Sequence, residues 1–107
     1  LLRRHYSPRT PVVLHRALDP KAAARALAAG RNEAWLFLAQ PRALDRGEPR
    51  VRWLDARGDL RRAARRLFAE LRALDRGGFD RIHVELAPGA GIADAINDRL
   101  RRAAART

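Results

Sequence analysis

The turn Pro88-Gly89-Ala90-Gly91 lies between a predicted strand and a predicted helix. Backbone N–H groups in such a turn, together with the positive end of the helix, can bind a phosphate. The turn lacks the full dinucleotide-binding fingerprint, because Asp94 stands where the third glycine would be, and it has no Walker lysine. Gly89, Ala90 and Gly91 are therefore a candidate phosphate loop. The alternative is that the glycines serve only the turn and the helix start.

A second candidate site is the N-terminal arm, residues 1–10, which is basic and polar. Arg4, His5 and Tyr6 place a cation, a titratable ring and a phenol in a segment without a predicted hydrophobic face. An arginine can donate two parallel hydrogen bonds to a phosphate, and the other two side chains can donate further ones. These residues are predicted to close over an anionic ligand, and the alternative is a solvated tail.

The other titratable residues show no catalytic or metal-binding pattern. His5, His15 and His83 lack metal-ligand spacing, and no nucleophile–base pair is recognisable. His83 lies between two apolar residues of a predicted strand, so we expect it to be packed or at a sheet edge. Glu85 lies near the carboxyl end of that strand, where α/β proteins gather their sites, but it has no obvious partner. No catalytic residue and no metal site are predicted.

The elements that must position these residues follow the order β-α-β-β-α-β-α. Such alternation favours a parallel sheet with helices on both faces. The second and third strands are not separated by a helix, so that pair is either antiparallel or joined by a long loop. The sequence predicts a small Rossmann-like three-layer α/β domain with a mostly parallel sheet of about four strands. The predicted strands are 12–14, 34–38, 51–54 and 81–86, and the predicted helices are 22–29, 60–74 and 92–103.

The length and composition fit one globular domain, residues 11–107, preceded by the arm. The 107 residues are 47% hydrophobic and 33% charged, which is not the composition of a disordered chain. No apolar run approaches the ~20 residues that span a bilayer, and no secretory signal is recognisable. The chain has no cysteine, which fits a reducing compartment, and we expect a cytoplasmic protein without a membrane partner. Because the first residue is Leu1 rather than methionine, we expect that the chain derives from a longer one.

The net charge of +11 allows two interpretations. A basic surface can bind nucleic acid, because clustered cations displace counterions from a phosphate backbone. Alternatively, the charge reflects a GC-rich genome, since Lys21 is the one lysine among 23 basic residues and alanine is also abundant.

The order of several segments resembles a known family. The segment His5-Tyr6-Ser7-Pro8-Arg9-Thr10-Pro11 is similar to the His-Tyr-x-Pro-x-Thr-Pro linker of two-domain threonylcarbamoyl-AMP synthases. Residues 67–75 resemble the long helix of the C-terminal domain of those enzymes, 79–85 its last strand and 91–100 its closing helix. The resemblance runs in order across nearly all of residues 5–104.

The resemblance implies an accessory role for this chain. The parent enzymes are nucleotidyltransferases that condense threonine, bicarbonate and ATP, bound with Mg²⁺, into threonylcarbamoyl-AMP and release pyrophosphate. Their product serves threonylcarbamoyladenosine formation during tRNA processing. The chemistry belongs to a separate catalytic domain, so this chain alone is expected to be inactive and to bind no cofactor of its own. By position, Arg4, His5 and Tyr6 match linker residues that would close over the ligand of that domain.

Two other functions stay open at this point. The first is a basic RNA-binding module that uses the arginines of residues 60–74 to contact tRNA. The second is a free-standing nucleotide-binding domain that holds ATP or pyrophosphate at Gly89 and Gly91. RNA binding through phosphates weakens steeply with salt, and that dependence separates the two.

Overall fold

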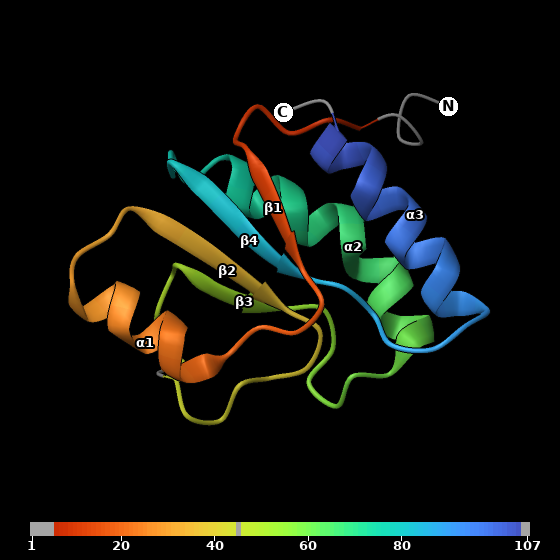
Figure 1. Ribbon diagram of the computed structural model, residues 1–107, viewed down its shortest axis with the longest axis horizontal. Helices are drawn as coiled ribbons and strands as arrows, with labels where there is room; N and C mark the ends of the chain where they lie inside the picture. The colour runs from red at the N-terminus through yellow and green to blue at the C-terminus, as the bar shows by residue number, and fades with distance from the viewer. Residues whose placement is uncertain (1–5, 45, 106–107) are drawn as a thin grey trace.

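Four parallel strands form a single sheet in the computed structural model, which describes residues 6–44 and 46–105 (Figure 1). The strand order is β1-β4-β2-β3, so β1 and β3 lie at the edges. Ile82 of β4 pairs with Val12 on one side and with Ala34 on the other. The second and third strands pair in parallel, which decides the orientation that the sequence left open. The strands are β1 (Val12–His15), β2 (Glu33–Phe37), β3 (Val51–Trp53) and β4 (Arg81–Glu85).

Three helices cover the two faces of the sheet. Figure 1 shows α2 and α3 side by side on one face and α1 on the other. The connections from β1 to β2 and from β2 to β3 move in one direction across the sheet, and the connection from β3 to β4 moves back. Because crossovers between parallel strands are right-handed, this reversal puts α1 and α2 on opposite faces. The predicted three-layer α/β fold is confirmed. The helices are α1 (Pro20–Ala28), α2 (Leu60–Asp75) and α3 (Ile92–Ala105).

Polar caps begin the first two helices. The Asp19 carboxylate accepts a hydrogen bond from the Lys21 N–H at 3.0 Å, and Pro20 occupies the first turn. The Asp59 carboxylate accepts one from the Arg62 N–H at 3.0 Å. Helix α1 ends one residue before the predicted position 29. These caps fix the helix starts close to the predicted boundaries.

The pleat of the central strand divides the core into two clusters. In β2, Ala34 and Leu36 point to the α2/α3 face, and Trp35 and Phe37 point to the α1 face. The α2/α3 cluster is the larger one and contains the largest side chains with almost no exposed surface. These are Leu36, Leu54, Leu67, Leu71, Leu74, Ile82, Val84, Ile96 and Leu100.

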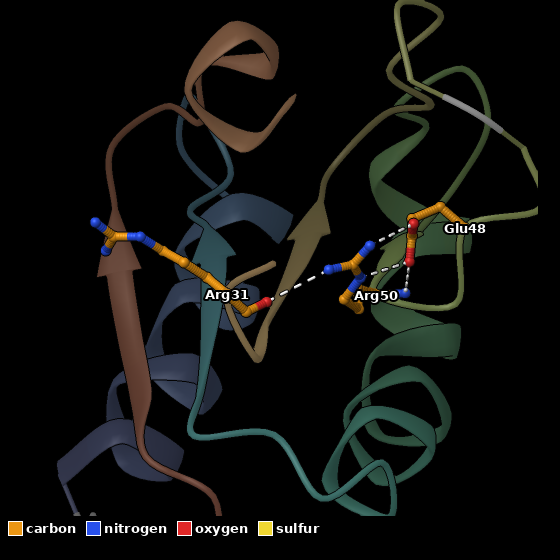
Figure 2. A network of polar contacts seen from close by, with 3 residues as sticks. All are labelled: Arg31, Glu48 and Arg50. Carbon is orange, nitrogen blue, oxygen red and sulfur yellow. Dashed lines mark hydrogen bonds and ion pairs between the residues drawn. The ribbon is translucent and has the colours of Figure 1, made fainter. Parts of the chain in front are cut away.

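An irregular segment joins β2 to β3, and its described residues, 38–44 and 46–50, form no crossover helix. Its end is fixed by Arg50, whose guanidinium donates to the Glu48 carboxylate through Nε at 2.8 Å and Nη2 at 2.9 Å. Arg50 Nη1 also donates to the Arg31 carbonyl at 3.4 Å (Figure 2). Leu44 of the same segment packs against the α1-face cluster. The segment therefore closes part of the α1 face without supplying a helix.

No helix within the described parts of the chain is long and apolar enough to cross a bilayer.

Candidate functional site

A single carboxylate, that of Asp75 at the end of α2, holds the described part of the arm. It accepts hydrogen bonds from the Tyr6 hydroxyl at 3.0 Å and from the Thr10 hydroxyl at 2.8 Å. It also accepts from the backbone N–H groups of Arg9 at 3.2 Å and Thr10 at 2.9 Å. Residues 6–10 of the predicted arm therefore lie on the body of the domain.

Tyr6 and Thr10 also pack against the domain, and the hydrogen bonds shift the pKa values of Tyr6 and Asp75. The Tyr6 ring meets Phe68 of α2 edge to face, with 6.3 Å between centroids, and Thr10 is only 7% exposed. Burial and the hydrogen bond to Asp75 raise the pKa of Tyr6 to about 12. Burial alone would raise the pKa of Asp75, but the hydrogen bonds that it accepts outweigh burial and hold that pKa below its usual value. The arm residues Arg4 and His5 lie outside the described residues.

The glycine turn that precedes α3 has a different geometry from an open phosphate loop. Gly89 and Gly91 adopt φ of 96° and 69°, a left-handed conformation that favours glycine. The Gly91 N–H donates to the Asp94 carboxylate at 3.1 Å. Gly89, Ala90 and Gly91 are all exposed. A carboxylate of the protein itself therefore occupies one of the N–H groups that a phosphate would use, and the phosphate-loop assignment stays a prediction.

The partner that the sequence did not reveal for Glu85 is the backbone of two neighbouring segments. Its Oε2 accepts from the Leu18 N–H at 2.9 Å, and its Oε1 accepts from the Leu38 N–H at 2.9 Å. Leu18 follows the end of β1, and Leu38 follows the end of β2. These two strands lie on either side of β4. Glu85 therefore joins three strand ends at the edge of the sheet where α/β proteins commonly bind ligands.

A chain of polar side chains crosses the α1 face of the sheet. The Nε2 atom of His15 lies 2.8 Å from Nδ1 of His83, and Nε2 of His83 lies 2.9 Å from Oε1 of Glu33. His83 also stacks on Trp35, with 4.2 Å between ring centroids. Burial and the neighbouring His83 lower the pKa of His15. The hydrogen bond from His83 lowers the pKa of Glu33 against the opposing effect of burial, and Arg81 contributes in the same direction.

Comparison with protein families decides where this domain belongs. The sequence matches the family model for the C-terminal domain of threonylcarbamoyl-AMP synthase over residues 1–105. The chain belongs to this family. The match confirms the resemblance drawn from residues 5–104. Searches of curated proteins and of solved structures returned no match.

Membership in the threonylcarbamoyl-AMP synthase family gives this C-terminal domain its biological context. It places the domain in the biosynthesis of threonylcarbamoyladenosine in tRNA, in association with the catalytic domain of the parent enzyme. No group of three His, Cys, Asp or Glu residues within 6–44 and 46–105 is arranged to hold a metal ion.

Two features of this synthase domain were missed by sequence reasoning. Asp75 anchors a segment that lies 65 or more residues away in the sequence. A local spacing of residues therefore could not predict this contact. His15, Glu33 and His83 come from three strands, and they meet only because the strand order places β4 between β1 and β2. The alternation around His83 correctly indicated a packed histidine, but it contained no information about its partners.

Proposed function

We propose that this domain is an accessory domain of a threonylcarbamoyl-AMP synthase that holds the linker arm at the active site of a separate catalytic domain. In this proposal the catalytic domain binds ATP with Mg²⁺ in the cytoplasm, and this chain alone makes no threonylcarbamoyl-AMP. The observation that supports it is the anchor at Asp75, where four hydrogen bonds fix the base of the arm.

A fixed base is useful to a segment that must close over a ligand. Each side chain that is immobilised only on binding costs free energy, and pre-organisation reduces that cost. Arg4 and His5 precede the anchored residues and are the proposed ligand contacts, since a guanidinium and an imidazole can both donate to phosphate oxygens. Tyr6 joins them only when its hydroxyl leaves Asp75, so closure would exchange one hydrogen bond for another.

The test uses the two-domain synthase, with this chain following a catalytic domain of the family. The variant Asp75→Ala removes the acceptor of all four hydrogen bonds, and Asp98→Ala is the control, because it removes an exposed carboxylate of α3. Pyrophosphate release is measured with ATP, threonine and bicarbonate. We expect kcat/KM to fall roughly tenfold for the first variant, equivalent to about 1.4 kcal/mol of transition-state stabilisation, and to change little for the control.

Thermal melting shows whether the Asp75→Ala variant is folded at the assay temperature, and Tyr6→Phe provides a milder change that keeps the ring. Equal activity of Asp75→Ala, Tyr6→Phe and the control would show that the anchor does not serve catalysis. Product formed by the isolated chain would contradict the accessory role.

One observation favours a second function, RNA binding by α2. Arg61, Arg62, Arg65 and Arg66 are all exposed on the first half of this helix. In this second proposal they contact tRNA phosphates, and the logarithm of the affinity falls by about 0.7 to 0.9 per contacted phosphate for each tenfold rise in salt. Titration of tRNA into the isolated chain at several salt concentrations measures that slope. A slope near zero would contradict this second function.

A further inference from the structure

We propose that the groove between α1 and β4 is a binding site for a phosphate or diphosphate group. The groove has a volume of about 470 Å³ and lies on the face of the sheet opposite α2 and α3. This site is separate from the arm and from the glycine turn, so the inference goes beyond the proposed function and does not depend on it.

The positions where an α/β domain commonly binds phosphate are already satisfied by its own side chains. Asp94 accepts from Gly91 in the turn before α3. Glu85 accepts from two N–H groups at the carboxyl edge of the sheet. The Asn97 amide pairs with both the N–H and the carbonyl of Ala87. An anion at any of these places would have to displace a hydrogen bond that exists.

The groove beside α1 combines three arginines with a polar floor. Arg25 of α1, Arg31 of the connection to β2 and Arg81 of β4 all line it. Its floor includes His83 stacked on Trp35, which is 7% exposed. On the α1 side the remaining lining residues are the small Ala22, Ala26 and Ala29. Small side chains on the helix leave space in which a ligand can approach the arginines.

Charge in the groove is not balanced. Glu33 is the one carboxylate that lines it, and this side chain already binds His83. The Arg81 Nη1 atom lies 3.5 Å from Glu33, which is long for a charge-assisted hydrogen bond, and half of the Arg81 side chain is exposed. Figure 2 shows that the Arg31 side chain points away from the Glu48–Arg50 pair. Three arginines and one carboxylate line the groove, which therefore has an excess of positive charge.

The ligand class follows from these groups. Guanidinium groups form paired hydrogen bonds with phosphate oxygens, whereas both ring nitrogens of His83 already contact His15 and Glu33. By contrast, in the hollow beside β3, with a volume of about 340 Å³, Arg52 and Arg66 both pair with the buried Glu70. With Arg46, three arginines line that hollow beside two carboxylates, Glu48 and Glu70. Three arginines line the α1 groove beside one carboxylate, so the α1 groove is the better phosphate site. Free pyrophosphate and the phosphodiester of RNA share this chemistry.

Titration of the chain with pyrophosphate, monitored by amide chemical shifts and calorimetry, tests the site. The double variant Arg25→Gln/Arg31→Gln removes two exposed cations of the groove, and Arg99→Gln/Arg101→Gln removes two exposed cations of α3. We expect saturable binding whose Kd rises roughly tenfold or more in the groove variant, because each lost guanidinium removes charge-assisted hydrogen bonds. The control should change Kd less than about threefold, since it alters only the distant field.

Competition then identifies the source of the phosphate. A short RNA that displaces pyrophosphate from the groove indicates an RNA backbone as the natural ligand, and an RNA that binds without displacing it indicates a free diphosphate. Non-saturable binding, equal weakening in both double variants, or shifts confined to Gly89–Gly91 would overturn the proposal. Loss of synthase activity on mutation of the arm would leave this result unaffected.

Discussion

The two faces of the sheet are built differently. The α2/α3 face is covered by two helices of 16 and 14 residues and buries only aliphatic side chains at its centre. The α1 face has one helix of nine residues, and it contains the polar chain of His15, His83 and Glu33. On that face Val13 is 38% exposed. Trp35 Nε1 is the one buried side-chain nitrogen or oxygen of the described residues without a hydrogen-bond partner.

This difference has a simple origin in the chain connections. The described residues that join β2 to β3, 38–44 and 46–50, form no helix, so among the described residues α1 is the one helix on the second face. Helix α1 contacts β2, and the β1 and β4 part of the face is left with exposed and polar side chains. The comparison indicates that the α2/α3 face provides most of the stability, whereas the α1 face has room for ligand binding.

The largest expected effect is a loss of stability on the α2/α3 face. Leu71→Ala should lower the free energy of unfolding by roughly 2–5 kcal/mol, because Leu71 is fully buried and its removal leaves a cavity. Val13→Ala on the α1 face should lower it by less than about 1 kcal/mol. Urea unfolding followed by circular dichroism measures both. Similar losses in the two variants would contradict the division of roles between the faces.

A smaller loss is expected from the anchor of the arm. Asp75→Ala in the isolated chain should lower the free energy of unfolding by about 1–3 kcal/mol, because Thr10 loses the acceptor of its buried hydroxyl and N–H groups. Amide hydrogen exchange of residues 6–10 should accelerate in the same variant. Unchanged exchange at Thr10 would show that packing against Phe68, rather than the carboxylate, holds this segment.

The pH dependence of stability should separate the two regions. The pKa of His15 is lowered in the folded state, so its contribution is complete above about pH 6.5 and is lost as the pH falls through the folded value. The pKa of Asp75 is also lowered, and its contribution is lost only below about pH 4. Stability should therefore decline in two stages on acidification. Urea unfolding at a series of pH values measures this decline.

Variants test which group contributes to each stage. His15→Gln should remove the first stage and leave the second, whereas Asp75→Asn should reduce the second and leave the first. A first stage that persists in His15→Gln would have to come from another group, and His15 would then not be the pH-sensitive residue.

The smallest effect is expected on the outer surface of α3. Arg102 pairs with Asp98 at 3.2 Å, one helical turn away, and both side chains are more than half exposed. Arg102→Ala should change the free energy of unfolding by no more than about 0.5 kcal/mol, because solvent screens such pairs. Thermal melting at low and high salt measures the change. A loss comparable to that of Leu71→Ala would show that surface charge, and not the core, dominates stability.

The sequence predicted the elements well but not the contacts between them. The caps at Asp19 and Asp59 and the apolar pattern of α2 are local signals, and local physical chemistry is enough to interpret them. Strand direction was left open for β3, because no predicted helix separates it from the preceding strand and a loop is compatible with either orientation. The sequence correctly placed Gly91 in a turn, but it did not predict the hydrogen bond from the Gly91 N–H to Asp94, which only the structure shows.

The candidate sites were the least predictable part of the molecule. The Asp75 anchor and the polar chain through His83 depend on residues brought together from distant parts of the sequence. Periodicity describes one element at a time and contains no information about such pairs. The groove beside α1 is likewise lined by residues of α1, β2, β4 and the connection from α1 to β2, which no local pattern brings together.

The anchoring of residues 6–10 to α2 also sets the length of the tether to any domain that is joined upstream. A free segment of five residues would span at most about 17 Å, and fixing it to the body removes this length from the flexible connection. A shorter flexible connection that can still span the two domains raises their effective concentration for each other. In a two-domain chain, the Asp75 carboxylate would therefore influence how often the two tethered domains meet.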